Sequence, residues 1–345
     1  MSTSYAEPVL TWYARNARDL PWRAPDATPW AVLVSEIMLQ QTPVARVLPE
    51  YLSWIARWPT PAALAASPAG EAIRQWGRLG YPRRALRLHE TATILVARHG
   101  GTVPAHLDAL RALPGIGSYT AAAVASFAFG QRHAVLDTNV RRVLARLVAG
   151  QPWAGTASSV SVAERRLAES LLPDEPAVAA RWSVAVMELG ALVCTAAGPR
   201  CGDCPVAREC TWLAAGRPEV GGAAATAGAA AGADGTAAMV GAAGAARSAG
   251  VSGASGAFGI SGASGVSGAA RRRTQKYEGT DRQCRGRVLA VLRATDDPVF
   301  RADFDAVWAK QAQLDRALDG LVADGLVDPL PDGRFALPGS APLSR

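Results

Sequence analysis

The chain of 345 residues is long enough for two folded units with a substantial buried core, which excludes a peptide or a miniature protein held by disulfides. Alanine supplies much of the 49 % hydrophobic content, aromatic residues reach only 6 %, and no run of bulky apolar residues is long enough to span a bilayer. The net charge of +7 favours a polyanionic partner, with nucleic acid first among the candidates.

The N-terminal segment, residues 1–16, carries Glu7 within an amphipathic pattern. A secretion signal would need a basic start and an apolar run at this place. We therefore expect a cytoplasmic protein, associated with the nucleoid and not with a membrane.

From residue 5 to residue 213 the chain is predicted to be an almost unbroken series of helices. Apolar residues recur there at helical spacing, and Pro and Gly stand between the segments. The main predicted segments are 30–41, 44–58, 85–98, 119–129, 140–148, 160–172 and 177–193. This pattern predicts an all-α domain over residues 1–220.

Residues 221–270 are almost entirely Gly, Ala and Ser, a composition that buries too little apolar surface to offset the entropy of ordering the chain. We expect a disordered linker there. Residues 271–287 follow as a basic arm, expected to add DNA affinity that does not depend on sequence.

Residues 288–345 are predicted to form a small winged-helix-like module. Helical patterns at 286–293, 301–310 and 314–324 precede two short strands on either side of Pro331-Asp332-Gly333. The third helix carries Asp315, Asp319 and Asp324 against Arg316, and DNA phosphates would repel it. We therefore expect this helix to have a packing or protein-contact role, with major-groove binding as the less favoured alternative, on a chain that acts as a monomer.

Four of the five cysteines form one cluster with the spacing C-x6-C-x2-C-x5-C, at Cys194, Cys201, Cys204 and Cys210. In a cytosolic protein such a cluster indicates metal more often than disulfides. Zinc and a [4Fe-4S] cluster both accept four thiolates, and the compact run favours iron–sulfur only modestly.

The segment Leu113-Pro114-Gly115-Ile116-Gly117 joins a short helical pattern to the helix that begins near Ser118. Glycines at a helix N-terminus let backbone N–H groups face an anion without a side chain in the way. With a helix on each side, the segment is predicted to be a helix-hairpin-helix clamp on DNA phosphate.

Two carboxylates are candidates for acid–base chemistry. Glu36 lies among apolar neighbours in a predicted helix, and burial there would favour its neutral, proton-donating form. Asp137 would by itself fit the N-cap of the next helix. Cleavage of a glycosidic bond requires two carboxyl groups in unlike environments, one to protonate the leaving group and one to stabilise the cationic sugar.

Several motifs together resemble the MutY adenine DNA glycosylases of the helix-hairpin-helix superfamily. They occur in the order found in that family and span about residues 5–213. They are Ser35-Glu36-Ile37-Met38-Leu39-Gln40-Gln41-Thr42, Leu79-Gly80-Tyr81, the glycine hairpin, Leu136-Asp137-Thr138-Asn139-Val140-Arg141-Arg142 and the four-cysteine loop.

The resemblance implies a role for each matching residue. It implies that Glu36 protonates adenine N7, that Asp137 stabilises the deoxyribosyl cation and that Asn139 orients this carboxylate. It implies a [4Fe-4S] cluster on the four cysteines. The family's adenine-pocket residues correspond to Trp22 and Arg23, and the pair that enters the duplex beside the orphaned base corresponds to Gln41 and Tyr81.

The resemblance also bears on the type of reaction. Endonuclease III relatives carry a lysine two residues after the second hairpin glycine, where this chain has Tyr119, which we count among the catalytic candidates. Residues 1–220 contain no lysine at all, so the domain offers no ε-amine for imine chemistry. We expect a monofunctional glycosylase without lysine-dependent lyase activity.

The sequence departs from the family at two places. Nothing after Gly221 has the length or strand content of the Nudix-like domain that inspects 8-oxoguanine in MutY proteins, and Pro82 stands where many relatives have a second Tyr. The expected substrate is duplex DNA with adenine opposite 8-oxoguanine or guanine. The alternatives are a T:G or U:G mismatch glycosylase of the same superfamily, which Tyr119 also fits, and a non-catalytic DNA-binding iron–sulfur protein.

Overall fold

A computed structural model describes residues 5–153, 159–219 and 277–340 of the chain. The predicted linker at 221–270 and residues 271–276 of the basic arm lie outside these ranges. Within them, no helix is both long enough and apolar enough to cross a membrane.

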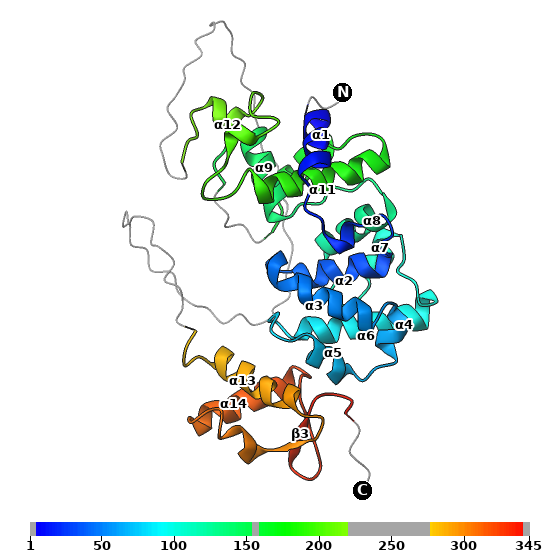
Figure 1. Cartoon of the computed structure of the whole chain (residues 1–345), viewed down its shortest axis with the longest axis vertical. Coiled ribbons are helices and arrows are strands. Elements are labelled where there is room, and N and C mark those ends of the chain that lie inside the picture. Colours follow the sequence, from blue (N-terminus) through cyan, green and yellow to red (C-terminus); the bar gives the residue numbers. More distant parts are fainter. Residues whose placement is uncertain (1–4, 154–158, 220–276, 341–345) are drawn as a thin grey trace, which may run out of the picture. The chain divides into compact units, whose positions relative to one another are not determined.

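The N-terminal part of the chain is helical, as the sequence predicts, and the predicted helices are found with ends shifted by a few residues (Figure 1). The elements are α1 (Ala6–Asn16), η1 (Pro21–Arg23), α2 (Pro29–Leu39), α3 (Val44–Arg57), α4 (Pro61–Ala65), α5 (Ala69–Gln75), α6 (Arg83–His99), α7 (Leu107–Arg111), α8 (Ser118–Phe129), α9 (Thr138–Leu147), α10 (Val162–Ser170), α11 (Pro176–Leu192), η2 (Cys201–Asp203) and α12 (Thr211–Ala214).

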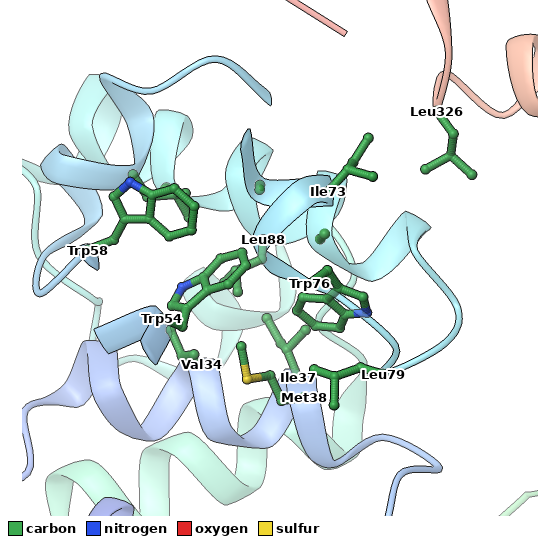
Figure 2. Packing of buried hydrophobic residues seen from close by; sticks show 14 of the residues in the cluster. Val34, Ile37, Met38, Trp54, Trp58, Ile73, Trp76, Leu79, Leu88 and Leu326 are labelled. Atoms are coloured by element: carbon green, nitrogen blue, oxygen red, sulfur yellow. The ribbon is translucent and has the colours of Figure 1, made fainter. Parts of the chain in front are cut away.

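Helix α2 runs through the centre of the first buried cluster. Every residue from Trp30 to Met38 is buried, as expected for a helix that is apolar on all sides and packs against α3, α6 and α8. Beside it the rings of Trp54 and Trp76 meet edge to face, with centroids 5.6 Å apart (Figure 2). This cluster fixes the position of any polar side chain that α2 carries.

A second buried cluster is built from α9, α11 and the N-terminal helix α1, which crosses α11 and packs against it (Figure 1). The chain after α1 therefore crosses from the second cluster to the first. This crossing contains η1, and it lines the cleft described below.

The C-terminal module contains α13 (Asp281–Ala294), β1 (Val299–Phe300), η3 (Arg301–Phe304), α14 (Gln311–Ala323), β2 (Asp328–Pro329) and β3 (Arg334–Ala336). The predicted hairpin is confirmed, with Asp328 opposite Ala336, and β1 adds a third strand on the other side of β3. The helix predicted at 301–310 is wrong, because Phe304 is buried against Phe335 and the segment makes one 3-10 turn. Helix α13 also runs across the module boundary expected at 287/288.

The module packs on α5, a contact that the sequence pattern did not identify. Leu326 belongs to the same buried cluster as Ile73 (Figure 2). Arg74 donates to the carbonyl of Thr295 at 2.9 Å, and the Gly70 N–H donates to Pro338 at 2.6 Å. A Cβ on Gly70 would lie 2.7 Å from the Cβ of Leu337, so this contact requires glycine.

Candidate active site

A cleft of about 1110 Å³ opens between the two buried clusters of the helical domain. Seven residues singled out from the sequence line it: Trp22, Arg23, Glu36, Gln41, Tyr119, Asp137 and Asn139. These residues come from η1, α2, α8, the start of α9 and the loop after α2, so folding brings together groups that are more than a hundred residues apart. Tyr81, Gly115 and Gly117 lie outside the cleft lining.

Glu36 lies in the middle of α2 and is only 6 % exposed. Burial raises its pKa to about 7, and the charge of Asp137 acts in the same direction. The hydroxyl of Tyr119 donates to the carboxylate, and this bond and the charge of Arg23 oppose the rise. Glu36 is therefore a carboxylic acid that is about half protonated near neutral pH.

Asp137 caps the N-terminus of α9, as its sequence position suggests, and both of its oxygens accept hydrogen bonds. Oδ1 accepts from the Val140 N–H at 2.6 Å, and Oδ2 accepts from the Asn139 side chain at 2.7 Å. Burial raises the pKa of Asp137, while these donors and the charge of Arg142 oppose the rise. Asp137 accepts more hydrogen bonds than Glu36 does, and each of these bonds favours its ionised form.

Asn139 is held from the other side by Arg142, which donates to its side-chain oxygen at 2.7 Å. The same guanidinium donates to the carbonyls of Gly190 and Cys194, at 2.7 and 2.6 Å. A Cβ on Gly190 would lie 2.7 Å from the Cβ of Asn139, so α9 and α11 touch at this point. A chain of hydrogen bonds thus connects Asp137, through Asn139 and Arg142, to the start of the cysteine loop.

Glu188 of α11, which was not among the candidate residues predicted from the sequence, is completely buried beside the cleft. It accepts from the Arg18 side chain at 2.6 and 2.8 Å and from Arg23 at 2.9 Å. Burial alone would raise the pKa of Glu188, but the bonds and charges of Arg18 and Arg23 hold it below its ordinary value. Its neighbours in the helix are apolar, the signal that identified Glu36, so the same criterion applied to residues 177–193 would have found it.

Trp22 is 7 % exposed and packs edge to face on Tyr51, with ring centroids 5.0 Å apart. It both belongs to the first buried cluster and lines the cleft. Its neighbour Arg23 reaches the cleft with its guanidinium fixed by Glu188.

The glycine hairpin joins α7 to α8 as the sequence predicts. Gly115 has φ +74°, and a Cβ there would lie 2.9 Å from Arg87 Cδ. Gly117 is the N-cap of α8 and contributes no side chain, so the first amide groups of this twelve-residue helix are available to an anion.

The four predicted ligand cysteines lie around one small cavity next to Arg146 and Trp212. Arg146 donates to the Cys194 sulfur at 3.5 Å and to the carbonyl of Thr195 at 2.7 Å. Burial raises the pKa of Cys204 to about 11. Four thiols around one cavity beside a cation are suited to bind an anionic group that takes several thiolate ligands. The described residues contain no group of three or more His, Cys, Asp or Glu placed to hold a single metal ion.

Comparison with known proteins extends this picture. Residues 34–170 match the model of the HhH-GPD superfamily base excision DNA repair protein. Adenine DNA glycosylase of Mycobacterium tuberculosis strain H37Rv is 47 % identical over 332 residues, covering 96 % of this chain and 92 % of the relative. The adenine DNA glycosylase of Mycolicibacterium smegmatis is 44 % identical, and the match covers 100 % of this chain and 99 % of the relative. The human adenine DNA glycosylase is 42 % identical, but the match covers 60 % of this chain and 39 % of the human protein.

Solved structures show the same fold. A thermostable thymine-DNA glycosylase has a TM-score of 0.55 and 28 % identity, covering 61 % of this chain and 95 % of that one. A trapped endonuclease III–DNA covalent intermediate has a TM-score of 0.50 and 23 % identity, and the match covers 60 % of this chain and 93 % of that one. At this identity the match shows only that the fold is shared. The mycobacterial matches run through the C-terminal module as well, and the chain belongs to the adenine DNA glycosylase family of the HhH-GPD superfamily.

Proposed function

We propose that this chain is a monofunctional adenine DNA glycosylase of base excision repair, which hydrolyses the N-glycosidic bond of adenine opposite 8-oxoguanine or guanine. The observation that carries this assignment is the pair of carboxyl groups in one cleft, of which Glu36 is buried and Asp137 is partly buried. Glu36 has a pKa of about 7, and Asp137 is held by three donor or cationic groups. Named adenine glycosylases that match nearly the whole chain support the same assignment.

In the proposed reaction Glu36 donates its proton to N7 of the extruded adenine. The bond between C1′ and N9 then breaks, and its electron pair leaves with the base. The Asp137 carboxylate stabilises the positive charge that develops on the deoxyribose, with Asn139 fixing its orientation. The Glu36 carboxylate, now ionised, accepts a proton from the water whose oxygen adds to C1′.

Arg23 and Trp22 are proposed to bind the adenine itself, and Tyr119 to hold Glu36 in place through its hydroxyl. The helical domain contains no lysine, so the reaction ends at the abasic site without an imine step.

DNA is proposed to bind across the mouth of the cleft. The amide groups at the start of α8, exposed by Gly115 and Gly117, would hold a backbone phosphate. Gln41 and Tyr81 would enter the duplex beside the orphaned base. A monomer working in the cytoplasm, at the nucleoid, is sufficient for this scheme, and the C-terminal module is free to make protein contacts elsewhere on its surface.

The four cysteines are proposed to hold a [4Fe-4S] cluster, which would supply a redox-active iron–sulfur group when bound. Arg146 lies against Cys194 and would neutralise part of the negative charge of four thiolates. Arg142 connects the same loop to Asn139, so the loop also supports the catalytic carboxylate.

The test is excision from duplexes that hold one central A:8-oxoG, A:G, T:G or U:G pair, followed by alkali to cleave abasic sites. We expect cleavage at adenine in the first two duplexes. Cleavage only at T or U would favour the alternative, a T:G or U:G mismatch glycosylase. The similarity to the structure of a thymine-DNA glycosylase is the reason to test it. Binding without cleavage of any duplex would favour a non-catalytic protein.

A further inference from the structure

Gln41 and Tyr81 lie on two separate loops, and both have a backbone conformation that is unusual for their residue types. Their φ angles are 55° and 48°, in the left-handed region where only glycine is unstrained. Gln41 follows the end of α2, and Tyr81 lies just before α6. Tyr81 is 48 % exposed, so its own packing does not hold it. Some other contact must hold both loops in these conformations.

Arg84, in the first turn of α6, makes that contact, although it is only 7 % exposed. Its guanidinium lies between the two loops and donates to oxygens on both of them. One terminal nitrogen donates to carbonyls at the end of α2 and the other to the second loop and to Thr42. The acceptors and distances are Ile37 O (3.0 Å), Met38 O (2.9 Å), Gln40 O (2.6 Å), Thr42 Oγ1 (3.0 Å), Leu79 O (3.4 Å) and Gly80 O (3.1 Å).

The acceptors explain why the side chain must be arginine. The last carbonyls of a helix have no partner within the helix, and a cation satisfies them best. A planar guanidinium reaches two groups of acceptors at once, which a lysine ammonium on a single stem cannot do. The cation also lies 5.1 Å from the ring centroid of Trp76, a core residue shown in Figure 2, and 5.6 Å from that of Tyr81.

Burial lowers the pKa of Arg84 to about 10, so the side chain remains a cation at neutral pH in spite of its surroundings. Arg282 of α13 also approaches the Tyr81 ring, at 5.2 Å from its centroid. The two arginines differ in one respect that a test can use. Arg282 is exposed, and within the described residues its one contact is with the Tyr81 ring. Arg84, by contrast, donates hydrogen bonds to the backbone of both loops.

We propose that Arg84 is a positioning residue for base extrusion, which fixes the Gln41 and Tyr81 loops as one rigid wedge. This inference rests on the proposed function, because it assumes that these two side chains enter the duplex. A wedge with one loop free would still permit DNA binding and would leave Glu36 and Asp137 in place. It would fail at separating the target base from its neighbours.

The test is Arg84→Lys, compared with Arg83→Lys and Arg282→Gln. Arg83 is adjacent, more than half exposed and paired with Asp324 of the module. Extrusion is read from the fluorescence of 2-aminopurine placed at the target position, which rises when the base leaves the stack. Chemistry is read from single-turnover excision of adenine in a paired duplex and of adenine in a single-base bulge, where little unstacking is needed.

We expect Arg84→Lys to lose most of the fluorescence rise and to slow excision from the paired duplex on the order of a hundredfold, while excision from the bulge changes less than about threefold. The two control variants should retain the wild-type rise. Thr42→Val, which removes one acceptor, should show an intermediate loss, and it provides a second measurement if Arg84→Lys unfolds. Circular dichroism checks the fold of each variant.

Equal slowing on paired and bulged adenine, with a normal fluorescence rise, would overturn the proposal, because Arg84 would then act on the catalytic cleft. The same loss in Arg282→Gln as in Arg84→Lys would also overturn it, since the ring contact would then be sufficient. If the wild-type protein removes no adenine from any duplex, the proposed function fails, and the fluorescence measurement still tests Arg84 by itself.

Discussion

Replacing Glu36 with Gln should make the protein more stable while it abolishes excision. The pKa of Glu36 rises from 4.5 to about 7 on folding, mainly by burial, so the folded state is penalised whenever this carboxyl group is ionised. The stability that the neutral form contributes is fully present below pH 4.5 and is lost as the pH rises through 7. A shift of about 2.5 pKa units corresponds to about 3.4 kcal/mol at pH 8 and to under about 1 kcal/mol at pH 5.

Glutamine has nearly the same shape and can still accept from Tyr119, but it carries no charge. Denaturant unfolding at pH 8 should therefore show Glu36→Gln to be more stable than wild type by about 3 kcal/mol, or about 6–12 °C in thermal midpoint. The gain should shrink toward zero at pH 5. A variant no more stable than wild type at pH 8, or one that is equally stabilised at both pH values, would refute the raised pKa.

The opposite result is expected for Glu188→Gln, which removes the buried carboxylate shared by the partly exposed Arg18 and Arg23 and should cost about 2–3 kcal/mol at pH 7, measured by denaturant unfolding against the exposed control Glu169→Gln. Its stabilising effect should be lost as the pH falls below about 4.5, because the pKa of Glu188 is lowered on folding. Excision by wild type should decline as the pH rises through about 7, since Glu36 acts as an acid, and a rate that is flat from pH 6 to 9 would contradict that role. Purified protein should be brown with broad absorption at the blue end of the visible range, and colourless protein with stoichiometric zinc would contradict the cluster. Gly70→Ala should lower the free energy of unfolding by about 1–3 kcal/mol in denaturant unfolding, because a Cβ there meets Leu337 at 2.7 Å, whereas Gly198→Ala, at an exposed glycine without positive φ and with open space around a Cβ, should leave it unchanged.

The sequence was sufficient for the residues whose role leaves a local signature. Glu36 was a candidate because a carboxylate on an apolar helix face has few explanations, whereas Asp137 by itself indicated the helix cap that it forms, and its catalytic role was suggested only by the resemblance. The cysteine cluster was recognisable from its spacing, and the glycine hairpin from its two glycines between two helical patterns. Each of these signals lies within about seventeen residues of chain.

Arg84 could not be found in this way, because five of its six acceptors are main-chain carbonyls, which every residue type has. The network from Asn139 through Arg142 to Cys194 was hidden for the same reason, since two of its acceptors are backbone oxygens. In the C-terminal module the pattern at 301–310 reads as helix locally, but the burial of Phe304 against the sheet decides its conformation.

The docking of the C-terminal module on α5 changes what the segment 220–276 connects. Glu219 and Tyr277, which flank it, belong to one compact unit, so the parts of the chain before and after it are not independent bodies. Cutting the chain within it should yield two fragments that remain associated through Arg74, Gly70 and the shared apolar cluster. The enzyme could therefore be expressed as two separate polypeptides that reassemble, with α13 and Arg282 returned to their place beside Tyr81.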